Sequence, residues 1–150
     1  MPLYKRDGVD GTAHKPARYV VLHGTAAITV GDAVVIDTGD TTNGAGYSVK
    51  KSALNDDPLA VGVAAETITA AGPIKVQISG YRDDCTARTG AITVGTMVGT
   101  AGTTGGDEGG VKQAGTISST VWPFALCVDA FTDDNANGIL LIEDRGFYGE

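Results

Sequence analysis

The chain has 150 residues, and 22 of them are glycine, against three Phe and one Trp. This length corresponds to one ordinary domain, and the scarcity of large side chains predicts a light hydrophobic core. A net charge of −7 argues against nucleic-acid binding, because affinity for the phosphate backbone depends on clustered Lys and Arg. No segment has the length and apolarity of a membrane helix or a secretory signal, so we expect a soluble protein with no membrane partner.

The first 17 residues are expected to form an extended arm. Proline and glycine interrupt them four times, and they have no apolar periodicity. The segment up to residue 18 carries a charge of +2, which leaves −9 for the rest of the chain. Its aromatic and basic side chains are the candidate contacts with a partner: Tyr4, Lys5, Arg6, Lys15 and Arg18.

From residue 18 to residue 150 the pattern predicts a single β domain with little helix. Short apolar and β-branched segments recur between clusters of Gly, Asn and Asp, which is typical of strands separated by turns. The expected strands cover residues 19–23, 33–36, 59–65, 74–79, 124–128 and 139–142. One helical turn is expected at most, at residues 50–56.

Two parts of the chain repeat each other. Residues 25–31 and 89–95 agree at six of seven positions, and Val34 is matched by Val98. Further matches follow in the same order: Val49-Lys50 with Val111-Lys112, 58–63 with 123–128, and Val76 and Ile78 with Leu140 and Ile142. We predict an internal duplication of about 24–81 and 88–147. Each copy has too few strands to close a core alone, so the expected fold is an all-β sandwich or small β-barrel built from two pseudo-repeated units.

Two Gly/Thr-rich segments, residues 37–46 and 99–110, are predicted to be flexible surface loops. Three adjacent acidic pairs, at 56–57, 83–84 and 133–134, are expected to be solvated in turns. Cys85 and Cys127 have no metal-binding or redox spacing and are predicted to be reduced, buried thiols. With His14 in the arm and His23 at the end of a strand, no catalytic set is expected, and the chain is predicted not to be an enzyme.

One segment has two interpretations. Asp133, Asn135 and Asn137, followed by glycine, match the first half of a calcium-binding loop. The twelfth position is Asp144 instead of the usual Glu, and no helix pattern flanks the segment. An Asn-Gly pair directly before an apolar strand is also a hairpin signal. The sequence favours the hairpin turn, keeps calcium as the weaker alternative, and predicts no cofactor.

The order of these motifs resembles that of the capsid decoration, or cement, proteins of tailed bacteriophages. The resemblance covers about residues 18–145 and consists of the two Ala-Ile-Thr-Val-Gly segments, the Pro-Leu-Ala-Val-Gly-Val-Ala and Lys-Val-Gln-Ile-Ser-Gly-Tyr segments, and the closing Asn-Gly-Ile-Leu-Leu-Ile. It implies a protein made in the host cytoplasm that binds the outer surface of the assembled head. The implied partners are the major capsid protein and two further copies of the chain, in a homotrimer.

The main alternative is a carbohydrate-binding or host-attachment module displayed on a virion. Sugar sites usually contain exposed aromatic side chains. The candidates are Tyr47, Tyr81, Trp122, Phe147 and Tyr148. Because Trp122 precedes a proline and an apolar strand, we expect it in the core or in a subunit interface.

Overall fold

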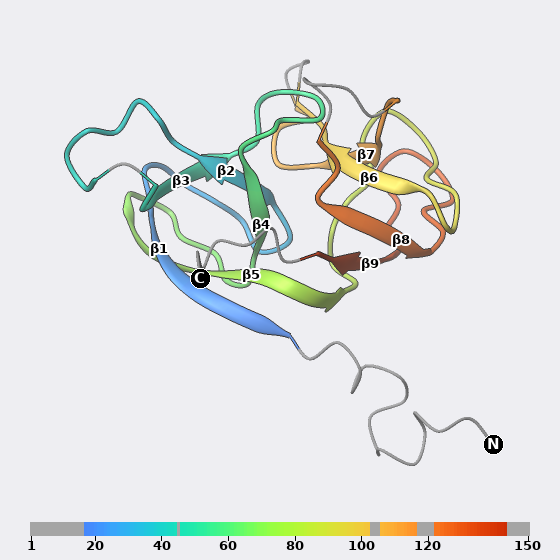
Figure 1. The fold of residues 1–150 in the computed structure, drawn as a ribbon, viewed down its shortest axis with the longest axis horizontal. Helices are drawn as coiled ribbons and strands as arrows, with labels where there is room; N and C mark the ends of the chain where they lie inside the picture. Colours follow the sequence, from blue (N-terminus) through green and yellow to red (C-terminus); the bar gives the residue numbers. More distant parts are fainter. Residues whose placement is uncertain (1–16, 45, 103–105, 117–121, 144–150) are drawn as a thin grey trace, which may run out of the picture.

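The computed structural model describes residues 17–44, 46–102, 106–116 and 122–143, and within these ranges it is all-β, as predicted (Figure 1). No helix in these ranges is long and apolar enough to cross a membrane. The helical turn expected at 50–56 is not formed, because residues 48–51 extend into a strand instead. The strands are β1 (Arg18–Gly24), β2 (Ala33–Ile36), β3 (Ser48–Lys51), β4 (Ala60–Ala64), β5 (Gly72–Arg82), β6 (Met97–Thr100), β7 (Val111–Gln113), β8 (Ala125–Asp129) and β9 (Ile139–Ile142).

The first half of the chain forms a closed five-stranded barrel with a core of its own, so the expectation that one repeat cannot close a core alone is wrong for this half. The strands pair in the order β1-β3-β2-β4-β5, and β5 pairs back to β1, so that this half has no open sheet edge. The closing pair is long, running from Arg18 opposite Ser79 to Gly24 opposite Gly72. The interior contains nine small or branched apolar side chains: Leu22, Ile28, Val34, Val49, Val61, Ala64, Ile74, Val76 and Ile78.

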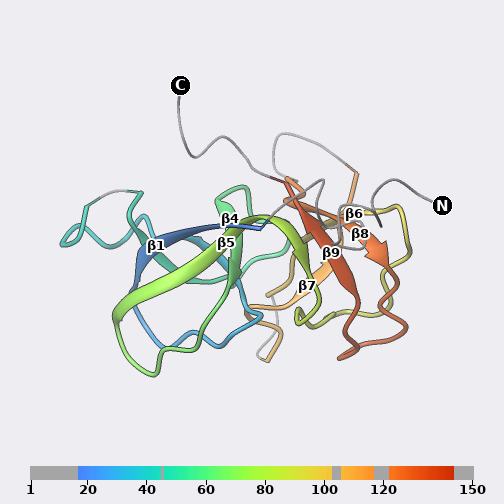
Figure 2. The same cartoon turned by 90° about the horizontal axis from the view of Figure 1, so that it is seen from below.

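The second half repeats the same pairings and shares a strand with the first. The order β7-β6-β8-β9 corresponds to β3-β2-β4-β5. Residues 80–82, at the end of β5, pair with β9, so β5 leaves the first barrel and enters the second half (Figures 1 and 2). Past β5, Thr86 bridges Asn137 and Ala87 bridges Val111 in parallel. These two bridges occupy the place that the end of β1 has in the first barrel.

The alignment of the repeats by sequence agrees with the strand registers of the structure except at one strand. Val34 lies opposite Lys51 as Val98 lies opposite Gln113, which fits the alignment of the repeats by sequence. Across β4 and β8, however, Val34 lies opposite Gly62 and Val98 opposite Ala125. The sequence match of 58–63 with 123–128 is therefore two residues out of register. A shift of two residues leaves each side chain on the same face of its strand, which explains why both alignments keep the apolar pattern.

The side chains of β2 point alternately into the cores of the two halves, so this strand connects them. Val34 points into the first barrel, whereas Ala33 and Val35 point outward and belong to the core of the second half. Backbone hydrogen bonds follow the same contact, from Ala33 N to Gly109 O at 2.6 Å and from Gly109 N to Ser52 O at 2.9 Å. The prediction of a surface loop at 99–110 is therefore wrong at both ends, where residues 99–102 and 109–110 are buried, with Gly99 against Asp56 and Gly109 against Asp32 of the first half. The segment at 37–46 is largely exposed, as predicted, apart from residue 45, which lies outside the described ranges.

Candidate functional site

The arm residues singled out from the sequence lie mostly outside the described ranges. This applies to Tyr4, Lys5, Arg6 and Lys15. Arg18 is described: it begins β1, is exposed, and lies opposite Ser79 of β5. The contribution of these five side chains to a contact stays a prediction, with β1 as the element that positions the last of them.

The 133–137 segment forms the connection between β8 and β9, which pair antiparallel as the hairpin interpretation requires. The guanidinium of Arg88 donates to the side-chain oxygen of Asn135, and Asn135 N donates to Ala87 O at 2.8 Å. Asn137 Oδ1 accepts from Thr86 Oγ1 at 3.4 Å. Two of the three oxygens proposed for calcium are therefore used in fixing this loop to residues 86–88, and a positive charge lies beside them. Within the described ranges, no group of three or more His, Cys, Asp or Glu side chains is arranged to hold a metal ion.

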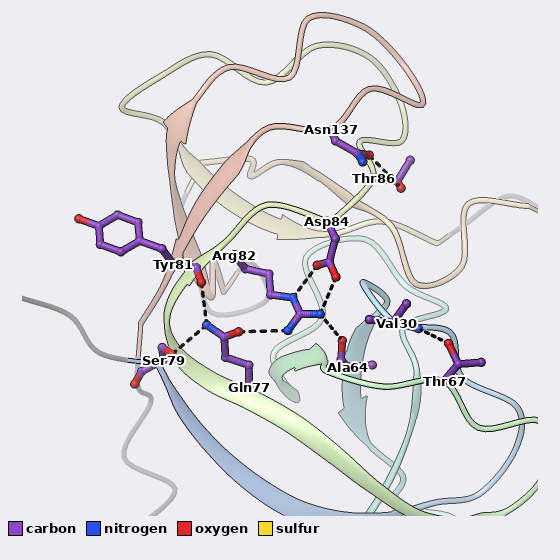
Figure 3. Close-up of polar contacts among 10 residues, drawn as sticks. All are labelled: Val30, Ala64, Thr67, Gln77, Ser79, Tyr81, Arg82, Asp84, Thr86 and Asn137. Carbon is purple, nitrogen blue, oxygen red and sulfur yellow. Dashed lines mark hydrogen bonds and ion pairs between the residues drawn. The ribbon is translucent and has the colours of Figure 1, made fainter. Parts of the chain in front are cut away.

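A polar cluster lies where β5 passes from one half to the other (Figure 3). Arg82 donates two hydrogen bonds to the carboxylate of Asp84, the one from Nη2 measuring 2.6 Å. The same Nη2 donates to Ala64 O at 3.0 Å, and Nη1 donates to Gln77 Oε1 at 3.2 Å. Gln77 is buried, and its amide nitrogen donates to the Ser79 carbonyl at 3.1 Å. The cluster satisfies the buried polar groups of this crossing, which assigns it a structural role.

Asp56 and Asp57 form a second polar contact between the halves. Both residues are only 6% exposed. Asp56 Oδ2 accepts from Lys112 Nζ at 3.0 Å, and Asp57 N donates to Thr100 Oγ1 at 2.8 Å. The expectation that the acidic pairs are solvated in turns is therefore wrong for 56–57, whereas Asp84 stays partly exposed while Arg82 binds its carboxylate. A buried carboxylate requires a partner charge, and here the partner is supplied by the other half of the chain.

Both cysteines are buried and free, as predicted. Burial raises the pKa of the Cys85 thiol far above its ordinary value. Burial likewise raises the pKa of Cys127, whose sulfur lies 3.3 Å from Asp129 O. A nucleophilic cysteine needs a lowered pKa and access to solvent, and these two thiols have neither.

An open depression of about 350 Å³ lies beside the segment that joins β2 to β3. Two carboxylates occupy it. Asp37 accepts from Thr25 Oγ1 at 2.8 Å and from Lys50 Nζ at 3.1 Å, and Asp40 accepts from Ser48 Oγ at 2.6 Å. Both carboxylates therefore hold this segment against the barrel. The lining residues are His23, Thr25, Asp37, Gly39, Asp40, Thr42, Asn43 and Ala71.

These contacts predict a contribution to acid stability. Hydrogen bonds from Asn43, Ser48 and Thr42 hold the pKa of Asp40 well below its ordinary value. A carboxyl group whose pKa is lower in the folded state contributes stability above its unfolded pKa, and that stability is lost as the pH falls toward the folded pKa. Below about pH 4, we expect the urea concentration at the unfolding midpoint of the wild type to decrease, and to decrease less in Asp40→Asn. Urea titrations at pH 7 and pH 3 measure this, and the exposed Asp83→Asn should behave as the wild type.

Large apolar side chains are exposed on both halves. Trp122, just before β8, is 47% exposed, so it does not lie in the core, and its place in a subunit interface stays a prediction. Its neighbourhood explains the error, because Phe124, two residues further on, fills the core position instead. The exposed large apolar side chains of the described ranges are Tyr19, Val21, Val30, Tyr47, Leu54, Leu59, Val94, Met97, Trp122 and Val128.

No protein-family model and no curated protein sequence matches this chain. A solved structure with a similar architecture is the head fiber gp8.5 N base in bacteriophage phi29. The TM-score is 0.55, and the match covers 85% of this chain and 94% of that one. The two share their fold. At 15% sequence identity the likeness extends no further than this arrangement of strands.

Proposed function

We propose that this chain is a non-enzymatic structural protein of a phage head, a decoration protein that binds the outer surface of the assembled capsid. It bridges neighbouring major capsid protein subunits and thereby stabilises the head. The observation that carries the proposal is the fold shared with a head fiber base over 85% of this chain. Because one fold can serve many functions, the surfaces of the chain have to support the same conclusion.

The exposed side chains support a bridging role. A stable protein interface buries about 1,200–2,000 Å² in total, so a protein that joins neighbours needs contact surface on more than one side. Val30 in the first half and Val94 in the second are both exposed, and each precedes a glycine with positive φ in the same repeated turn. Each half thus presents an exposed apolar side chain at this repeated turn. We further propose a homotrimer, in which three duplicated chains place six similar units around one axis, as symmetric shell positions require.

Exposed aromatic side chains favour the alternative, a carbohydrate-binding or host-attachment module. Tyr47 is 46% exposed and Trp122 is 47% exposed. They belong to opposite halves, since Tyr47 precedes β3 and Trp122 precedes β8. Phe147 and Tyr148 lie outside the described ranges.

One binding experiment separates the two functions. The purified protein is mixed with undecorated heads and, in parallel, with a panel of host glycans. We expect saturable co-sedimentation with the heads, extra density on their outer surface in an image reconstruction, and greater resistance of the heads to heat. Binding to glycans without binding to heads contradicts the decoration function and supports the alternative.

Removing the arm is expected to abolish head binding without unfolding the protein. The variant lacks residues 1–17 and keeps Arg18, so that β1 and both halves remain complete. Occupancy on undecorated heads and the thermal melting curve are the two measurements. A full-length variant with Lys5→Gln, Arg6→Gln and Lys15→Gln separates the charge of the arm from its length. Unchanged occupancy of the shortened chain excludes the arm from the contact.

A further inference from the structure

The same cross-strand pair is covered in one half of the chain and open in the other. In the first half, Ala33 of β2 lies opposite Val63 of β4, and both are fully buried beneath the second half. The equivalent pair in the second half is Met97 of β6 opposite Leu126 of β8. Met97 is 40% exposed, and Leu126 is half-buried. The second half therefore presents, uncovered, the outer face that the first half buries.

Exposed apolar residues adjoin the pair of Met97 and Leu126. Val94 lies in the turn before β6, and Val128 follows Leu126 by two residues along β8; both are exposed. The turn glycines differ in the same way: a methyl group at Gly31 would overlap the carbonyl of Asp84, whereas at Gly95 it would meet nothing. We define the open face as Val94, Met97, Leu126 and Val128. On the first half, the residues equivalent to Met97 and Leu126 are covered by the second half.

The cover within the chain comes from two places in the second half. Gly109 O accepts the hydrogen bond of Ala33 N, and the Asp84 backbone packs on the turn at Gly31. By strand register, Gly109 corresponds to Tyr47, because Val111 and Val49 hold equivalent positions in β7 and β3. Asp84 corresponds to Val21, because the bridge of Thr86 to Asn137 matches the pair His23 with Pro73.

These corresponding residues are themselves exposed and apolar. Val21 is 58% exposed and Tyr47 is 46% exposed. Tyr19 lies two residues before Val21 on the outer side of β1, with Lys75 Nζ 4.8 Å from the centre of its ring. Tyr47 lies beside β1, since its carbonyl accepts from His23 N at 3.0 Å. We define the β1 face as Tyr19, Val21 and Tyr47.

We infer that a second copy of this chain docks head-to-tail, with its β1 face on the open face of the first copy. In this contact, the first half of one copy covers the second half of the other, as the second half covers the first within one chain. The inference rests on the self-association included in the proposed function and assigns its surfaces. A head-to-tail contact uses two different faces, so it closes into a ring when the rotation per step allows it, and alternating halves then follow one another around that ring.

Two variants and their mixture test this contact. Met97→Glu places a charge on the open face, and Val21→Glu places one on the β1 face, where Lys75 opposite it can pair with the new carboxylate. Each variant alone is expected to be a monomer by light scattering, while the wild type associates. Each variant retains one intact face, and these two faces are complementary. Mixed in equal amounts, the variants should therefore form a one-to-one dimer that cannot grow further.

The controls make each outcome decisive. Leu54→Glu changes an exposed side chain outside both faces and should keep the mass of the wild type. Melting curves verify that all variants are folded. A mixture that stays monomeric, a single variant with the mass of the wild type, or a monomeric wild type overturns the inference. Head binding is measured separately: a wild type that associates through these faces without binding heads contradicts only the decoration function, and a monomeric wild type that binds heads contradicts only the docking contact.

Discussion

Replacing Gly62 with alanine is expected to lower the free energy of unfolding by about 3 kcal/mol, at the upper end of the usual range for overpacking. Gly62 lies in the middle of β4, where a methyl group would overlap the carbonyl oxygen of Gln77 on β5. Because β5 is paired with β1, β4 and β9, its backbone cannot move away without breaking other pairs. Urea unfolding followed by circular dichroism measures the change.

Gly72→Ala is the matched control for this substitution. Gly72 begins β5, and a methyl group there would meet no atom within 4 Å. We expect a change of no more than about 0.5 kcal/mol, as for most surface positions. The second half supplies a natural comparison, because Ala125 holds the position of Gly62 in the register of β8. Equal effects of Gly62→Ala and Gly72→Ala would contradict the close approach of β4 to β5.

Truncating Phe131 to alanine is expected to have the largest effect, a loss of about 4 kcal/mol. Phe131 is fully buried, and its backbone exchanges two hydrogen bonds with Ile92, at 2.9 and 3.1 Å. It is one of only three phenylalanines in the chain, so a light core loses one of its largest members. The cavity left behind adds to the lost transfer free energy, since the surrounding strands relax only partly.

The repeat provides the control here as well. Ile68 exchanges the same two backbone hydrogen bonds with Ile28 in the first half, but its side chain is only partly buried. Ile68→Ala should therefore have a smaller effect, about 2 kcal/mol. Trp122, the single tryptophan, reports on the second half by fluorescence, while circular dichroism reports on all strands. A smaller loss for Phe131→Ala than for Ile68→Ala would be inconsistent with their burial.

The strands that the sequence predicted correctly are those with a visible alternation or apolar run. Val34, Val76 and Leu140 lie in such segments, and each occupies a core position in the structure. The strands β3 and β7 were not predicted as such, because each contributes one core valine, Val49 or Val111, which is followed directly by a lysine. Only the pairing with β2 and β6 makes these short segments strands, and pairing partners depend on the whole fold.

The polar contacts and the exposed faces were harder to predict from the sequence than the strands. Asp56 looks like any turn carboxylate until Lys112, 56 residues away, is placed beside it. Arg82 and Asp84 are two residues apart, a spacing that gives a hint of a local ion pair. The exposure of Met97 had no signal at all, because Ala33, its equivalent, is buried in an otherwise similar strand. Whether a sheet face is covered is decided by how the halves are arranged, and the sequence pattern of one strand does not contain that information.

The sharing of β5 also determines how such a chain can be divided or lengthened. Residues 72–79 of β5 pair with β1, and residues 80–82 pair with β9, so one continuous strand serves both halves. A cut within residues 72–79 therefore opens the first barrel along β1, and a cut within residues 80–82 removes residues that pair with β9. Conversely, a further unit added at the end of such an array would require four new strands instead of five, since the preceding unit already supplies the first. Strand sharing is thus an economical way to lengthen a protein of this fold.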